Sequence, residues 1–235
     1  MTPNIKQTKL PVLLIALFLP AVITTIYMLF LKDTVWGNIL MIFQIVWLAG
    51  WPLLRGQPSQ IITEIKNCKK KIQSIAAGII SGIILFGVLF AGYQFFKNDL
   101  LQYASRGYGE ADLAALRQLF FVYALFGCVF NTLIEELYWR RFVFGKLEQK
   151  TNTIVAAVVS AICFGIHHYI MLVFIFSLFY VLLIGTLIVV AGFIWNILFS
   201  KYKTIIPGWI SHAFVVAMLM IVIADVVYEQ GIIDI

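Results

Sequence analysis

The stretch NTLIEELYWRR, residues 131–141, places two adjacent carboxylates in a run that is otherwise apolar enough to cross a bilayer. An ionised group in hydrocarbon costs several kcal/mol, so Glu135 and Glu136 are candidates for a functional site. The alternative is that both glutamates end a helix beside Arg140 and Arg141, as a charge cluster at the membrane surface.

The composition is that of a membrane protein. Of the 235 residues, 62% are hydrophobic and 12% are charged, against about 25% charged residues in soluble domains. We therefore predict an all-α polytopic membrane protein that forms a single transmembrane domain over residues 1–235. The three cysteines show no CxxC spacing, so they predict neither a disulfide framework nor a cysteine-rich metal site.

Seven apolar segments are each long enough to cross about 30 Å of hydrocarbon. They cover about residues 10–31, 35–54, 75–96, 119–144, 153 through 168, 172–199 and 205–224. A break in the sixth segment, at Gly185 or Gly192, would give eight helices instead of seven.

The basic residues predict the orientation in the membrane. Of the 17 lysines and arginines, 13 lie in the predicted inner segments and four in the outer ones, which favours a cytoplasmic N-terminus. They lie at segment ends and form no patch with interleaved aromatic residues, so the lipid bilayer is the expected partner and nucleic acid is not. The expected location is the cell membrane, as a multi-pass protein of the bacterial cytoplasmic membrane.

Residues 1–114 are predicted to form N-terminal helices joined by a basic cytoplasmic loop at 55–72. Within that loop, apolar residues recur at helical spacing among four lysines: Ile61, Ile65, Cys68 and Ile72. This pattern fits an interfacial helix on anionic lipid, or a basic linker.

Two polar pairs stack along the helix that carries the glutamates. Asn131 and Glu135 are four residues apart, and so are Glu136 and Arg140. Glutamate before arginine is the favourable order for an ion pair. Glu136 thus has a cationic partner, whereas Glu135 has only a neutral amide one turn away, which suits Glu135 to act as a general base.

Two histidines are placed to meet Glu135. Glu135 lies 16 residues before Thr151 and His168 lies 16 after Asn152, so a helical hairpin that turns there brings both to similar depth. His212 follows Pro207 and enters from the same side. His167 is about 100° away from His168 on a helix, so only one of these two can face the glutamate. The alternative role for such histidines is hydrogen bonding between helices.

A carboxylate and two imidazoles support two kinds of peptide hydrolysis. Glu135 can activate water while the imidazoles orient it or stabilise the oxyanion. Alternatively Glu135, His168 and His212 can bind a catalytic zinc ion with one open position. The sequence has neither HExxH, as in soluble zinc proteases, nor GxSxG or SxxK, as in serine enzymes.

These motifs resemble the CPBP family, which comprises CAAX prenyl proteases and bacteriocin-processing and self-immunity (Abi-type) proteins. Its EExxxR motif is matched by Glu135, Glu136 and Arg140, and its FxxxH motif by Phe164 and His168. Its third motif, HxxxN or HxxxD, is matched by His212 alone, since position 216 is valine. The resemblance covers about residues 115–220, which would be the catalytic core.

The resemblance implies that Glu135 activates water, His168 positions it and His212 stabilises the oxyanion, with Glu136 and Arg140 as support. The cofactor is zinc if the mechanism is metal-dependent and none otherwise. Asn131 or Asn196 would have to replace the donor that is missing at Val216. The expected function is an intramembrane endopeptidase that cleaves a peptide or membrane-protein substrate near the cytoplasmic side. The alternative is a non-catalytic membrane protein for bacteriocin self-immunity or signalling, with a bacteriocin or a sensor kinase as partner.

Overall fold

The computed structural model describes residues 10–56, 70–107 and 110–229, and this part of the chain holds helices and turns but no strand. Seven of its helical stretches are long and apolar enough to cross a membrane. They are Leu10–Leu31, Val35–Leu54, Lys71–Tyr103, Leu116–Glu148, Thr153–Val173, Leu178–Tyr202 and Ile206–Tyr228. The all-α polytopic prediction is confirmed.

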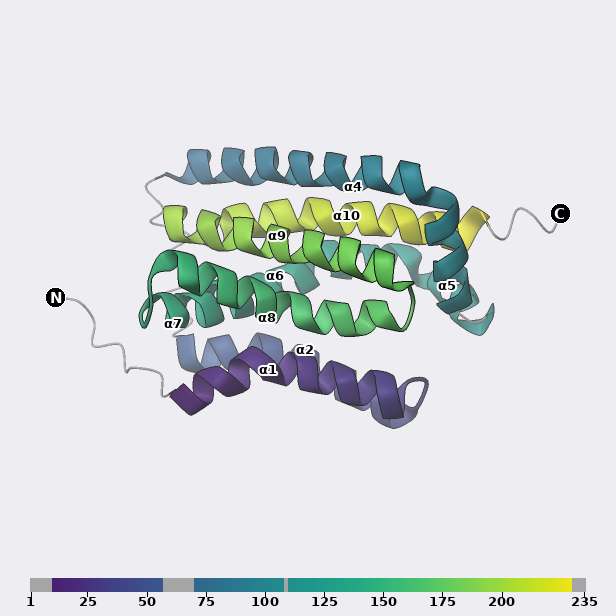
Figure 1. Ribbon diagram of the computed structural model, residues 1–235, viewed down its shortest axis with the longest axis horizontal. Coiled ribbons are helices and arrows are strands. Elements are labelled where there is room, and N and C mark those ends of the chain that lie inside the picture. Colours follow the sequence, from purple (N-terminus) through teal and green to yellow (C-terminus); the bar gives the residue numbers. More distant parts are fainter. Residues whose placement is uncertain (1–9, 57–69, 108–109, 230–235) are drawn as a thin grey trace.

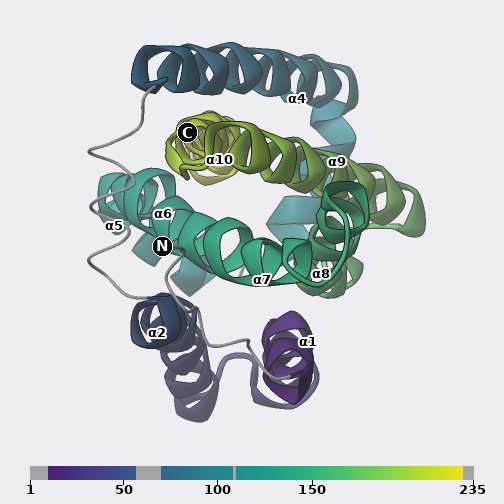
Figure 2. The ribbon, with the colours of Figure 1, turned by 90° about the vertical axis from the view of Figure 1, so that its left-hand side faces the viewer.

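The helices lie side by side in layers (Figures 1 and 2). Helix α4 (Lys71–Gly107) forms one face and packs along α10 (Ile206–Glu229). Below them α9 (Leu178–Tyr202) packs on α8 (Thr153–Val173), and α1 (Leu10–Ile26) covers the other side of α8. The centre of the bundle therefore lies among α8, α9, α10 and the span that carries the glutamates.

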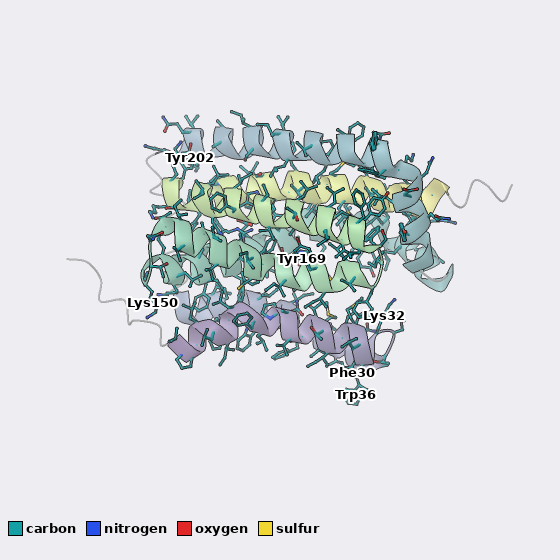
Figure 3. All side chains as sticks on the ribbon, in the orientation of Figure 1. Phe30, Lys32, Trp36, Lys150, Tyr169 and Tyr202 are labelled. Carbon is teal, nitrogen blue, oxygen red and sulfur yellow. The ribbon has the colours of Figure 1, made fainter. Side chains whose placement is uncertain are left out.

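The two ends of the bundle differ in the side chains that they carry. Lys150 and Tyr202 lie at the end where α8 and α10 begin, whereas Phe30, Lys32 and Trp36 lie at the opposite end (Figure 3). The last three surround the connection from η1 (Tyr27–Leu31) to α2 (Val35–Gly56). Aromatic and basic side chains at helix ends are typical of membrane–water interfaces.

The third span is longer than predicted. Helix α4 continues to Gly107, with one non-helical residue at Phe96 (φ −108°, ψ 15°), and α5 begins at Glu110. The predicted end of the third segment at about residue 96 is therefore wrong, because the helix continues for 11 more residues. The interfacial helix considered at 61–72 lies mostly outside the described residues.

The fourth span is not one regular helix. Along it follow α5 (Glu110–Leu125), η2 (Phe126–Asn131), α6 (Thr132–Glu136), η3 (Leu137–Phe144) and α7 (Gly145–Glu148). The two η segments are π-helical, with wider turns than an α-helix, and such segments are frequent at functional sites. They flank the five-residue α6 that carries both glutamates.

The sixth span begins later than predicted. Helix α8 runs to Val173, a turn follows, and α9 starts at Leu178, so the predicted boundary at Leu172 is wrong. Helix α9 continues through Gly185 and Gly192, where no break occurs. Both glycines instead let α8 approach closely: a Cβ at Gly185 would meet the ring of Tyr169, and one at Gly192 would lie 3.0 Å from Phe164 Cδ1.

Candidate active site

Glu135 and Glu136 are both buried in the centre of the bundle, with 9% and 0% of their surface exposed. Helix α6 has only five residues, so the side chains that pair with its two glutamates come from neighbouring elements. Carboxylates at this depth require charged or hydrogen-bonding partners. Each glutamate has a different set of partners, and the two sets share His212.

Glu136 is the structural carboxylate. Its Oε1 lies 3.2 Å from Nη2 of Arg140 and 3.1 Å from Nδ1 of His212. The Arg140 guanidinium is fully buried and also lies over the rings of Phe164 and Trp195, 4.6 and 5.1 Å from their centroids. The predicted i, i+4 pair therefore forms, supported by two cation–π contacts.

Glu135 faces different neighbours. Its Oε1 accepts a hydrogen bond from Nδ2 of Asn131 at 2.9 Å, and its Oε2 lies 3.7 Å from Nε2 of His212. The amide fixes one oxygen, so the other is directed toward the imidazole. A distance of 3.7 Å between a carboxylate oxygen and a ring nitrogen is longer than a direct hydrogen bond. Oε2 of Glu135 can therefore accept a proton from a bound molecule.

His212 is held on one face of its ring and at one nitrogen. The ring of Trp195 stacks on it with centroids 4.1 Å apart and planes 23° apart, and Trp195 Nε1 donates to Oγ of Ser211 at 3.0 Å. Because the Glu136 carboxylate can only accept, the Nδ1 atom of His212 donates to it, and Nε2 faces Glu135. Trp195 was not among the predicted site residues, because no motif in a single sequence distinguishes it from the other tryptophans.

His168, and not His167, belongs to this site. Nδ1 of His168 donates to the carbonyl of Phe164 at 3.0 Å, and the Phe164 ring lies edge-on to both His168 and His212, with centroids 4.8 and 6.1 Å away. His167 is buried on another side of α8, where it stacks parallel to Trp139 with an angle of 4° between the rings. The structure thus brings Glu135, His168 and His212 together from three helices.

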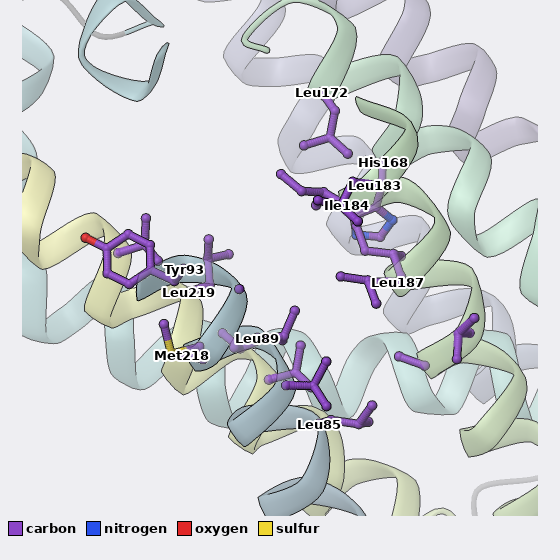
Figure 4. A pocket seen from close by; sticks show the side chains of 18 of the residues that line it. Leu85, Leu89, Tyr93, His168, Leu172, Leu183, Ile184, Leu187, Met218 and Leu219 are labelled. Carbon is purple, nitrogen blue, oxygen red and sulfur yellow. The ribbon is translucent and has the colours of Figure 1, made fainter. Parts of the chain in front are cut away.

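An apolar cavity of about 300 Å³ adjoins these histidines. Its walls come from α4, α8, α9 and α10, and His168 and His212 are among the lining residues. Figure 4 shows Leu85, Leu89 and Tyr93 on one side of it and His168, Leu172 and Ile184 on the other. Almost all of the remaining lining is aliphatic or aromatic, so the histidines form its polar end.

Position 216 lies in the wall of this cavity, where the third CPBP motif would place a polar side chain. Val216 lines the cavity one turn after His212, close to Gly127. Of the two asparagines considered as replacements, Asn131 donates to Glu135, and Asn196 donates to the carbonyl of Ala157 at 3.0 Å. Both amide nitrogens therefore already have acceptors.

The same three residues, Glu135, His168 and His212, are the candidate ligands for a metal ion. Within residues 10–56, 70–107 and 110–229, no three His, Cys, Asp or Glu side chains are arranged to hold a metal ion. As placed, Glu135, His168 and His212 do not form the set of three ligands that a catalytic zinc ion requires.

Residues 117–218 match the family model described as type II CAAX prenyl endopeptidase Rce1-like, which belongs to the CPBP family. The match spans all the motif residues named above, so the CPBP resemblance is confirmed over this part of the chain. It supports an intramembrane protease of the CAAX type in general. No curated protein and no solved structure matches the chain.

Proposed function

We propose that this chain, a multi-pass membrane protein whose residues 117–218 match the Rce1-like family, hydrolyses a peptide bond by glutamate-activated water. The observation that carries the proposal is the convergence of Glu135, His168 and His212, in which the two histidines form the polar end of an apolar cavity. A general base and two imidazoles are sufficient for acyl transfer to water.

The base in this proposal is Glu135. A water molecule held between its Oε2 and the imidazoles attacks the scissile carbonyl, and its proton passes to the carboxylate. The protonated Glu135 then gives this proton to the leaving nitrogen as the C–N bond breaks. One water is consumed, and the carboxylate returns to its starting form.

His212 stabilises the oxyanion, and His168 positions the attacking water. With protons on both nitrogens, His212 donates to Glu136 through Nδ1 and to the oxyanion through Nε2. Stacking on Trp195 and the contact with Glu136 fix this ring before the reaction begins. Such preorganised donors contribute most when they need no rearrangement in the transition state. His168 positions the water through its free Nε2.

The cavity indicates what lies next to the scissile bond. An extended peptide in it would bring N–H and C=O groups against an almost wholly apolar lining, where each unpaired group is costly. A hydrocarbon chain meets no such cost. The substrate we propose therefore carries an apolar chain beside the cleaved bond, in agreement with the prenyl endopeptidase description of the matching family.

The cleavage site lies in the cytoplasmic half of the bilayer, as we propose from the excess of basic residues at that side. His212 is six residues from the first residue of α10, or about 9 Å along the helix. A membrane-anchored peptide can reach this depth from the cytoplasm while its apolar chain stays in hydrocarbon.

The test is the Glu135→Gln variant. Purified protein in lipid vesicles is given an internally quenched peptide that ends in a prenylated CAAX sequence, and release of fluorescence is measured. We expect the variant to lose a factor of about 10² to 10⁴ in kcat while its folding is unchanged, since glutamine keeps the shape but not the base. A variant as active as the parent chain would overturn the proposed mechanism.

Val216 favours a second candidate function, a self-immunity or regulatory membrane protein that binds its partner without cleaving it. The position lines the cavity but offers no hydrogen-bond donor. In that case the Glu135→Gln protein would still protect cells from a bacteriocin or transmit a signal. Loss of both cleavage and protection in this variant would exclude the non-catalytic function.

A further inference from the structure

We propose that Phe96 and Tyr180 close the far end of the cavity and set the longest hydrocarbon chain that the substrate can carry. The inference rests on the proposed function, in which the cleaved bond lies at His168 and His212. We call these two residues the end wall. Both line the cavity, Phe96 from α4 and Tyr180 from α9.

The cavity has a defined length. Along α10 its lining extends from His212 to Val222, ten residues or about 15 Å of helix. On α8 the lining extends from Phe164 to Leu172, in the same direction. The two histidines lie at one end of this space. The end wall lies toward the other end, where the backbone of α4 is non-helical at Phe96.

The end wall is held rigidly. The hydroxyl of Tyr180 donates to Oδ2 of Asp99 at 2.6 Å, and its ring packs edge-on against Phe96, with centroids 5.5 Å apart. Tyr103 contacts the same ring at 5.7 Å. Tyr180 is only 5% exposed, so a chain that reaches it meets a fixed ring and not a mobile side chain.

The bend in α4 brings these partners into place. Phe96 has non-helical backbone angles, and beyond it the last turns of α4 run down across the end of the bundle (Figure 1). Asp99 and Tyr103 lie on this last part of α4 and contact the start of α9. A straight α4 would leave the cavity open at this end, and the bend closes it.

A fixed wall makes binding depend on chain length in a specific way. Each methylene that enters the cavity gains van der Waals contacts with its apolar lining, so binding becomes stronger as the chain lengthens. A methylene beyond the wall cannot be accommodated and gains nothing, or forces side chains out of position. Affinity therefore rises with chain length up to a cutoff and then stops rising.

The experiment measures binding separately from cleavage. The Glu135→Gln protein in detergent micelles is titrated with one short peptide whose cysteine carries linear S-alkyl chains, from octyl to octadecyl. Gly92→Phe, made in the same background, measures non-specific partition: Gly92 lines the cavity, and a ring there would occupy it. The cutoff is the chain length at which the difference between these two proteins stops increasing.

We expect Tyr180→Ala and Phe96→Ala each to move the cutoff to longer chains, and Tyr180→Phe, which keeps the ring, to leave it unchanged. Two alanine variants are used so that a failure of one to fold does not end the test. The same cutoff in all variants, or no cutoff up to octadecyl, would overturn the inference. If the parent chain cleaves none of the peptides but the cutoff moves as expected, the end wall is supported and the proposed hydrolysis is not.

Discussion

One oxygen of Glu136 is shared by Arg140 and His212: Oε1 lies 3.2 Å from the arginine Nη2 and 3.1 Å from the histidine Nδ1. The buried cation and the proposed catalytic ring are thus connected through a single carboxylate atom. This arrangement gives the EExxxR motif a physical meaning, in which the second glutamate orients His212 and the arginine balances its charge.

Arg140→Met tests how strongly the fold depends on this pair. Removal of one partner of a buried ion pair leaves an uncompensated charge, which destabilises a protein by about 3–5 kcal/mol. We expect the variant to lose its folded structure at a markedly lower temperature, measured by thermal inactivation in detergent. The control is Lys203→Ala, because Lys203 pairs with Glu148 but is 65% exposed, and such a pair contributes at most about 1 kcal/mol. Equal losses in the two variants would contradict a special role for Arg140.

Gly208→Ala tests the space around Glu136. A Cβ at Gly208 would meet Oε2 of Glu136, so the carboxylate must move and His212 loses its fixed partner. We expect at least a tenfold fall in kcat in the peptide assay. Gly87→Ala is the matched control, because nothing lies within 4 Å of a Cβ there, and alanine in a helix is favoured by about 1 kcal/mol. If Gly87→Ala reduces the rate as much, the effect is not specific to Glu136.

The sequence predicts the fold class and much of the site because both follow from local spacing. The i, i+4 rule brings Glu136 to Arg140, and the equal distances from the Thr151-Asn152 turn bring Glu135 and His168 together. The first relation lies within one helix, and the second needs only the position of the turn between two helices. The charge and hydropathy patterns predict seven spans for the same reason.

What the sequence does not predict depends on contacts between helices. Trp195 is one of many aromatic residues in apolar segments, and only the packing of α9 on α10 shows that it stacks on His212. Gly185 and Gly192 read as breaks in isolation, yet the close approach of α8 makes them packing positions. The helical extension past Phe96 was missed because the polar residues after it are typical of a loop.

The two adjacent histidines give a prediction with an internal control. His168 lines the cavity, so His168→Ala removes the group that positions water and lowers kcat by about 10² or more. His167 stacks on Trp139 away from Glu135, so His167→Phe keeps the ring contact and most of the activity. Both variants are measured with the quenched peptide. An inactive His167→Phe protein that is still folded would reverse the assignment.

Zinc dependence gives a prediction about cofactors. The glutamate mechanism needs no metal, so we expect activity to survive prolonged dialysis against a tight zinc chelator, with kcat changed less than about twofold. Metal content of the dialysed protein is measured in parallel. Loss of activity that returns on addition of zinc would show an essential metal and would overturn the metal-free mechanism.

Val216→Asn tests whether the valine limits the rate. Position 216 lines the cavity one turn after His212, so an amide there can donate to the developing oxyanion. Loss of one such donor costs about 10² to 10³ in kcat in other hydrolases, and because His212 already serves this oxygen, we expect a gain of about tenfold. Val222→Asn also introduces an amide into the lining, about 15 Å from His212, and should not raise kcat. A gain only in Val216→Asn would show that the parent chain is a hydrolase with one donor missing. An unchanged kcat in Val216→Asn, with the protein still folded, would show that His212 stabilises the oxyanion without a further donor.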